Sequence, residues 1–286
     1  MTTYSTPTPI SAVIRIAHGD VRFVADDRVD TDVTVAPTAT GRDADVRAAE
    51  NARVDFVDGT LTIIGPKSNA LAFGKRIGSI QVTVELPAGS RVEVVSGMGT
   101  IAGAGVLGDC RMRTGAGDIR LGHAATVDLD TGLGSIAADR ISGDATCGTG
   151  SGSIRIGRVD GNAQVKNSNG ETWIGEGGTS VRVKASNGRV VVERAHGDVR
   201  AASANGDLVV SSAERGTVEL RTGLGRIDVG VTEGTAARLD LHSSFGNVVS
   251  EMERTDRPAA SERTVEISAR TSAGDIVVRR SLAATH

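Results

Sequence analysis

A short pattern that returns about every 18 residues constrains this chain more than any other feature. The pattern is a turn glycine, one variable residue, and two apolar residues, usually branched, that are separated by one position. The clearest copies begin at Gly99, Gly117, Gly134, Gly152, Gly170, Gly188, Gly206 and Gly225, at spacings of 18, 17, 18, 18, 18, 18 and 19 residues. Two looser copies begin at Gly246 and Gly274. A fixed period of this kind indicates stacked structural repeats.

Each repeat predicts two short strands. Apolar residues alternate after the glycine, as in Ile154 and Ile156, and a second alternating run precedes the next glycine, as in Ala163 and Val165. Period two is typical of a strand with one buried face. Several repeats close with Asn-Gly, and both residues tolerate the positive φ of a tight turn. Because one rung cannot bury its own apolar face, the sequence predicts an all-β, single-domain β-solenoid, parallel β-helix-like, with rungs of about 18 residues.

Two other repeat folds have related periods. A left-handed hexapeptide helix repeats in multiples of six, but the inward positions 154, 156, 159, 163 and 165 do not follow six-residue steps, so this is the weaker alternative. Calcium-binding β-rolls use tandem Gly-Gly-x-Gly-x-Asp nonapeptides. This chain has only single Gly-Asp steps without paired ligands. We therefore predict no bound metal and no cofactor.

The first 90 residues are less regular but keep the alternation of strands. The hexapeptide Ala-His-Gly-Asp-Val-Arg occurs at residues 17–22 and again at 195–200, which indicates a variant of the same unit. We predict that residues 1–90 form an irregular β cap and residues 91–286 form the solenoid repeats, as one continuous domain. Segments 66–79 and 251–263 break the pattern and predict protruding loops.

Several short motifs, in this order, carry a resemblance to a known family. They are Gly-Asp-Val at 19–21, Val-Glu-Leu-Pro-Ala-Gly at 84–89, the serial Gly-x-Ile/Val-x-Val steps, and Thr-Ser-Ala-Gly-Asp-Ile at 271–276. In these motifs the chain resembles the bacterial β-strand-repeat proteins known as putative adhesins. The resemblance covers nearly the whole chain and implies a β-solenoid. It supplies no catalytic residues.

Composition and charge narrow the possible classes further. Aromatic residues make up 2% of the chain, so the core has to be built from aliphatic residues and Thr, which suits a narrow interior. With 35 acidic and 32 basic side chains the formal net charge is −3, which gives no global electrostatic reason to expect a nucleic-acid binder. There is no basic N-terminal segment followed by an apolar stretch, and no 18-residue apolar run. We therefore expect a cytoplasmic bacterial protein without membrane insertion.

No group of residues predicts a catalytic site. His123 and His196 fall four rungs apart, which corresponds to about 19 Å at a strand spacing of about 4.8 Å. Gly-Leu-Gly at 132–134 and 223–225 lies between strands and not before a helix, so it does not predict a nucleotide site. The outward carboxylates with the best spacing have arginines in the same columns of the preceding rung, so they predict an Arg–Asp ladder across strands. The members of that ladder are Arg111, Arg113, Asp128 and Asp130.

Two outward surfaces predict binding instead. Trp173 is the only tryptophan and lies in a column with Arg155, Val191 and Val209, and we predict that this stripe binds a protein partner or a second copy. Taken as an isolated surface aromatic, Trp173 would instead rest under Arg155 in a cation–π contact without further meaning. A second face stacks Lys166, Arg182, Lys184 and Arg200 on the second strand of three rungs, beside Gln164. An anionic polymer could bind there, although the aromatic platform of single-strand nucleic-acid binders is missing. The alternative interpretation of each surface is a covered stripe or a solvated face.

The leading hypothesis is a non-catalytic structural or binding protein that presents extended faces to a protein, a polymer or copies of itself. The alternative is an enzyme that uses a solenoid face or a pocket under the two loops, lined by Phe73 and Met252, on a carbohydrate or natural product. A third class, a module that binds antibiotics or senses envelope stress, would fit the family resemblance. The two cysteines, Cys110 and Cys147, predict buried thiols outside any disulfide.

Overall fold

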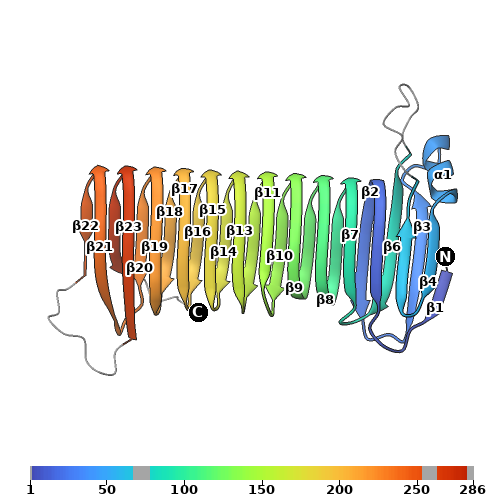
Figure 1. Cartoon of the computed structure of the whole chain (residues 1–286), viewed down its shortest axis with the longest axis horizontal. Helices are drawn as coiled ribbons and strands as arrows, with labels where there is room; N and C mark the ends of the chain where they lie inside the picture. Colours follow the sequence, from blue (N-terminus) through green and yellow to red (C-terminus); the bar gives the residue numbers. More distant parts are fainter. Residues whose placement is uncertain (1, 67–77, 253–262, 282–286) are drawn as a thin grey trace. The chain divides into compact units, whose positions relative to one another are not determined.

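The computed structural model describes residues 2–66, 78–252 and 263–281. These residues are mostly β-strand (Figure 1). They fall into two compact units, Met1–Asp139 and Arg140–His286. In each unit the strands stack as parallel two-stranded rungs, which confirms the predicted β-solenoid. The cap boundary near residue 90 and the single domain stay predictions. Within the described residues no helix is both long and apolar enough to cross a membrane.

The C-terminal unit has two faces, each a row of parallel strands. The odd-strand face consists, in stacking order, of β11 (Ala145–Ser151), β13 (Asn162–Asn169), β15 (Ser180–Asn187), β17 (Asp198–Asn205), β19 (Gly216–Leu224), β23 (Arg263–Ala273) and β21 (Thr235–Phe245). The even-strand face consists of β12 (Ile154–Val159), β14 (Thr172–Gly177), β16 (Val190–Ala195), β18 (Leu208–Ala213), β20 (Ile227–Val231), β24 (Ile276–Arg280) and β22 (Val248–Ser250).

Alternate residues of every strand point into the core. On the odd-strand face Val165, Val183 and Ala201 occupy one inward column, in the register that an 18-residue step requires. On the even-strand face Ile154 and Ile156 point inward and are 1% and 0% exposed. The outward residues between them form columns of side chains, one rung apart, and these columns carry the candidate site.

The stacking order at the end of the C-terminal unit differs from the sequence order. The last rung of the sequence, β23 with β24, lies between the rung of β19 with β20 and the rung of β21 with β22. The two looser repeats at Gly246 and Gly274 therefore do not stack in sequence order, as a simple serial solenoid would. The segment 253–262 that joins them is outside the described residues.

The N-terminal unit has the same kind of insertion at its beginning. β2 (Ser11–Asp26) forms a whole rung by itself. On one side it pairs with the rung of β5 (Thr60–Ile64) and β6 (Ile80–Pro87). On the other side it pairs with the rung of β7 (Arg91–Met98) and the start of β8 (Ile101–Ala116). The next rung combines the second half of β8 with the start of β9 (Ile119–Leu133). The second half of β9 begins the following rung and leads into β10 (Ile136–Ile141), in which the division between the units falls.

Antiparallel strands cover the outer edge of this first parallel rung. β3 (Asp30–Pro37) pairs with β6, β4 (Arg53–Val57) pairs with β5, and β1 (Thr2–Ser5) pairs with β3. The helix α1 (Asp43–Glu50), which the sequence analysis did not predict, packs beside β3. Its buried Asp45 accepts hydrogen bonds from the backbone N–H groups of Ala39 and Ser79.

The turn glycines are required by the stacking itself. At Gly188 the backbone has a φ of 133°, and an added Cβ would lie 2.1 Å from the carbonyl oxygen of Gly170 in the preceding rung. In several rungs the same turns are also held by side chains. The hydroxyl of Thr222 donates to the carbonyl of Gly206 (2.9 Å), and the carboxylate of Asp207 accepts from the backbone N–H of Arg226 (2.8 Å). The Gly-Asp steps are therefore links between rungs.

The cysteines conform to their prediction. Cys110 and Cys147 are 3% and 1% exposed, and neither is in a disulfide. Burial raises the pKa of the Cys110 thiol to about 12, so it stays protonated near neutral pH.

Candidate functional site

Two outward columns of the odd-strand face collect basic side chains. One column contains Lys166, Lys184, Ala202 and Arg221 on successive strands β13, β15, β17 and β19. The adjacent column contains Gln164, Arg182, Arg200 and Glu219 on the same strands. Strand periodicity puts both columns on the solvent side, because the residues between them fill the core.

The basic side chains differ in whether a carboxylate neutralises them. Arg200 forms an ion pair with Glu219 at 3.2 Å, so this predicted member of the face is compensated within the chain. Lys166, Arg182, Lys184 and Arg221 are exposed, and none has a carboxylate oxygen within 4.0 Å among the residues that the structure describes. We refer to these four residues as the basic array.

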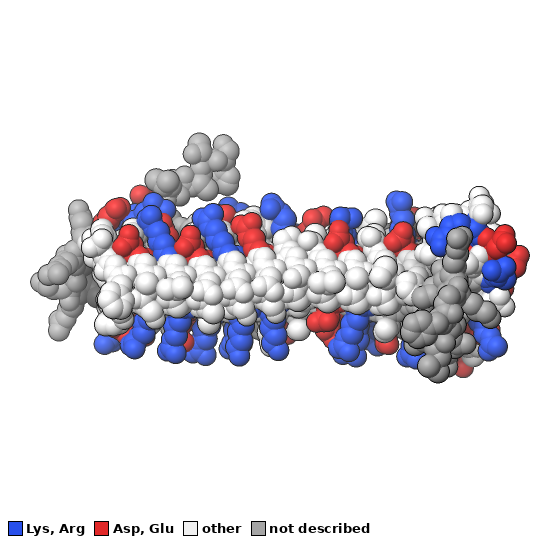
Figure 2. Space-filling model, turned by 90° about the horizontal axis from the view of Figure 1, so that it is seen from above, with Lys and Arg blue, Asp and Glu red and all other residues white. Residues whose placement is uncertain are grey.

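Figure 2 shows the setting of the two faces. The turns form a ridge without charged residues, and over the C-terminal unit Lys and Arg predominate along its lower flank. Along the upper flank, basic and acidic residues alternate. A surface with interleaved charges of both signs has a weak net field, whereas like charges on adjacent strands add. On the odd-strand face, therefore, fewer of the positive charges are neutralised by neighbouring carboxylates than elsewhere on the surface of this unit.

The Trp173 column lies where the sequence predicted it, on the even-strand face. Arg155, Trp173, Val191 and Val209 are in register on β12, β14, β16 and β18. The guanidinium carbon of Arg155 lies 4.0 Å from the centre of the Trp173 ring, which confirms the predicted cation–π contact. Trp173 Nε1 also donates to the carboxylate of Glu193 at 3.2 Å.

The column exposes less apolar surface to solvent than the sequence analysis predicted. Val191 is only 6% exposed, and Trp173 and Val209 are half-buried. Trp173 already has a cation on its ring and an acceptor for its N–H group. The prediction that this column binds a partner stays a prediction, as does covering by segment 251–263, most of which is outside the described residues.

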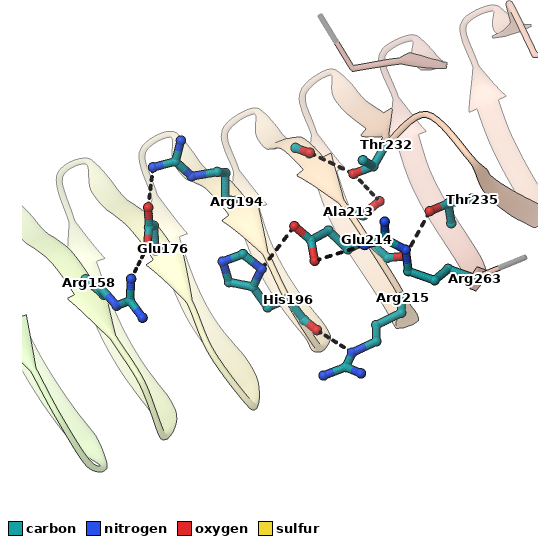
Figure 3. A network of polar contacts seen from close by, with 11 residues as sticks. Arg158, Glu176, Arg194, His196, Ala213, Glu214, Arg215, Thr232, Thr235 and Arg263 are labelled. Carbon is teal, nitrogen blue, oxygen red and sulfur yellow. Dashed lines mark hydrogen bonds and ion pairs between the residues drawn. The ribbon is translucent and has the colours of Figure 1, made fainter. Parts of the chain in front are cut away.

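A shallow groove of about 620 Å³ lies along the corner where each even strand turns into the next odd strand. Its charged residues pair with one another from rung to rung (Figure 3). Glu176 binds both Arg158, at 2.9 Å, and Arg194. His196 Nδ1 lies 3.1 Å from Glu214, and Arg215 Nε donates to the carbonyl oxygen of His196 at 3.0 Å.

Arg158 and Asp160 at this corner are also paired with each other. The hydrogen bond from Arg158 is the main cause that lowers the pKa of Asp160, and the same contact raises the pKa of Arg158. Both groups therefore stay ionised across the neutral range, whereas general acid–base catalysis needs a group whose pKa lies near the working pH. Sequence reasoning did not pick out this charge chain, although Arg158, Glu176 and Arg194 follow one another at the 18-residue step.

Comparison with known proteins identifies the family. Residues 13–280 match the Toastrack DUF4097 family. The chain belongs to this family. The match covers almost all of the chain, and it confirms the resemblance to the putative adhesins on which the sequence analysis relied. No curated protein matches the chain at a comparable level.

The solved structures that match this Toastrack chain share little sequence with it. A putative lipid binding protein from Parabacteroides distasonis has a TM-score of 0.46 at 15% identity, and the alignment covers 97% of this chain and 95% of that one. A putative adhesin from Bacteroides fragilis has a TM-score of 0.36 at 15% identity, with the same coverage. A putative adhesin from Parabacteroides merdae has a TM-score of 0.38 at 14% identity, over 80% of this chain and 92% of that one.

The remaining predicted residues of the Toastrack chain fall into two groups. The Arg–Asp ladder is present in part in the N-terminal unit: Asp128 binds Arg111 at 3.1 Å and Arg113 at 3.5 Å. Asp130 lies in register with Arg113 but has no ion pair among the described residues. This structural role was the predicted one. Of the two side chains expected to line a loop pocket, Phe73 is outside the described residues, and Met252 is the last described residue before the 253–262 gap.

Proposed function

We propose that this chain is a non-catalytic binding module that holds an extended anionic polymer on its odd-strand face. The observation that carries the proposal is the basic array: Lys166, Arg182, Lys184 and Arg221 are exposed and have no carboxylate partner among the described residues. In contrast, Arg158 and Arg194 beside the corner groove, and Arg200 on the odd-strand face, are in ion pairs.

The spacing of the array suits a polymer. Neighbouring strands lie about 4.8 Å apart, so Lys166 and Lys184 hold their ammonium groups at the separation of one rung, and Arg221 follows two strands farther on. Like charges on adjacent strands repel, and a chain of anionic groups laid across the strands would relieve that repulsion. Such binding needs no pocket and no catalytic group.

The chemistry favours a polysaccharide or polyphosphate over single-stranded nucleic acid. Proteins that bind single strands combine a basic groove with aromatic side chains on which the bases stack. The one tryptophan, Trp173, is on the opposite, even-strand face and contacts Arg155. The recognition expected here is electrostatic, so it weakens as salt is added.

The test is equilibrium binding of a labelled polyphosphate or heparin, measured by fluorescence anisotropy at low ionic strength. A variant with Lys166→Gln, Arg182→Gln and Lys184→Gln keeps a polar, uncharged side chain at each position and removes three positive charges from an exposed face, so the fold should be unaffected. We expect binding to weaken by about 10-fold or more. A matched control, Arg200→Gln, removes one charge that Glu219 already compensates and should change binding much less.

Two results would overturn the proposal. One is a wild-type protein that does not bind either polyanion at low salt. The other is a triple variant that binds as well as the wild type.

A further inference from the structure

The end of the C-terminal unit is an open strand edge. β21 pairs with β23 on one side, and among the described residues no strand pairs with it on the other. Every other strand of the odd-strand face from β13 to β23 has a neighbour on both sides. The outer edge of β21 therefore presents backbone N–H and C=O groups that can still form a ladder.

The core is open at the same place. On β23, Ile267 and Ala269 point inward and are fully buried, whereas their partners on β21, Leu239 and Leu241, are only half-buried. On the last even strand Val248 is 45% exposed, although the equivalent Ile276 is fully buried. In this last rung, the apolar side chains that would complete the core are thus left partly exposed to water. Their exposure favours binding of another element over them.

β21 also lacks most of the features that keep strand edges from pairing. It has 11 residues, with no proline and no charged residue at an inward position. In the N-terminal unit, by contrast, antiparallel strands β3 and β4 cover the edges of β6 and β5. Proteins commonly protect an edge with charges, prolines, bulges or a covering element. β21 has outward charges at Arg238 and Asp240, but it has no proline, no inward charge and no covering strand among the described residues, so its edge is a site for strand addition.

We propose that β21 pairs with β21 of a second copy, antiparallel, about a two-fold axis at Leu239. Two requirements select this register. The inward residues of both copies must face the same core, so each odd-numbered residue has to lie opposite an odd-numbered residue. Charges must also complement one another. With Leu239 on the axis, Arg238 lies opposite Asp240 of the second copy, and the symmetry repeats that pair.

The neighbouring registers fail the second requirement. An axis at residue 238 would put Arg238 opposite itself, and an axis at residue 240 would put Asp240 opposite itself. Like charges directly opposite one another are destabilising in a sheet. In the Leu239 register the two odd-strand faces join into one continuous face, with both basic arrays on the same side. This inference does not depend on the proposed function, but it would double the number of charges available to a polymer.

A charge exchange tests the pairing. Arg238→Asp and Asp240→Arg, each alone, put like charges opposite one another across the axis, and the double variant restores opposite charges. Each single change should raise the dimer dissociation constant by about 10-fold or more, and the double variant should return it close to the wild-type value. Sedimentation velocity of the full chain over a concentration series measures this constant, and circular dichroism shows whether each variant is folded.

The design separates pairing between copies from effects within one chain. Asp240 also binds Arg270 at 3.1 Å, and Arg238 lies beside Glu266 on β23. If the charges acted only through those contacts within one chain, the double variant would lose both contacts, and its dimer dissociation constant would be further from the wild-type value than that of either single variant. As a second variant, Leu239→Lys puts a charge at the inward position on the axis and should abolish the dimer.

Three outcomes would overturn the proposal. The first is a wild type that is monomeric at about 200 µM; protected β21 amides in that monomer would assign the edge to another segment of the same chain. The second is a dimer that neither single charge change weakens. The third is a double variant that dimerises less well than both single variants.

Discussion

At the scale of single residues, the turn glycine does the most to fix the fold. Its φ lies in the region that favours glycine, and its Cα approaches the carbonyl of the preceding rung so closely that no Cβ fits. This could be predicted, because the spacing and the Asn-Gly steps are local features of the sequence. The hydroxyl of Thr222, which binds the carbonyl of Gly206, was not predicted, because its partner is 16 residues away and belongs to another rung.

Replacing one of these glycines should destabilise the protein strongly. In Gly188→Ala the new Cβ would have to displace the Gly170 carbonyl, which lies 2.1 Å from its ideal position, at a positive φ. We expect a loss of at least about 2 kcal/mol in the free energy of unfolding, measured by urea denaturation. The control is Gly41→Ala, because a Cβ there meets no atom within 4 Å. Equal stability of Gly188→Ala and the wild type would contradict the stacked-turn geometry.

At the scale of elements, the periodicity of the sequence predicted where the strands lie, but it did not predict the order in which they stack. The alternating runs predicted the strands, because inward and outward positions differ in polarity at every second residue. They could not predict that β23 inserts between β19 and β21. The inward residues at this position are Val218 on β19, Ile267 on β23 and Leu239 on β21. Because all three are apolar, the pattern allows any of the three strands to lie beside either of the others. The helix Asp43–Glu50 was missed because its mean hydropathy is low and its buried Asp45 serves local backbone groups.

The inserted order makes a specific prediction about local stability. Ile267→Ala on β23 removes buried atoms and should cost about 2–5 kcal/mol. Because β21 is held by β23 alone in the described chain, amide hydrogen exchange should accelerate in residues 235–245 together with residues 263–273. Amides of β13 and β15 should keep their protection. If exchange accelerated in β23 while β21 stayed as in the wild type, the inserted order would be wrong.

At the scale of the whole molecule, the fold was predictable and the binding face only in part. Lys166, Arg182 and Lys184 were recognised as one face because Lys166 and Lys184 are one 18-residue step apart and Arg182 lies two positions before Lys184 on the same strand. Arg221 was missed because Ala202 interrupts its column and the next step is 19 residues. The same 19-residue step brings Glu219 beside Arg200, which removes Arg200 from the set of uncompensated charges. Knowing which charges are paired required the register of the strands as well as the repeat.

The salt dependence of polyanion binding tests the central claim of this account most directly. If the basic array contacts the polymer, the logarithm of the association constant falls linearly with the logarithm of salt concentration, since bound counterions are released from the polymer. Removing Lys166, Arg182 and Lys184 as positive charges should reduce the magnitude of that slope by about 2 to 3, whereas Arg200→Gln should leave it nearly unchanged. A triple variant with the wild-type slope would show that the polymer binds elsewhere, and would contradict the account.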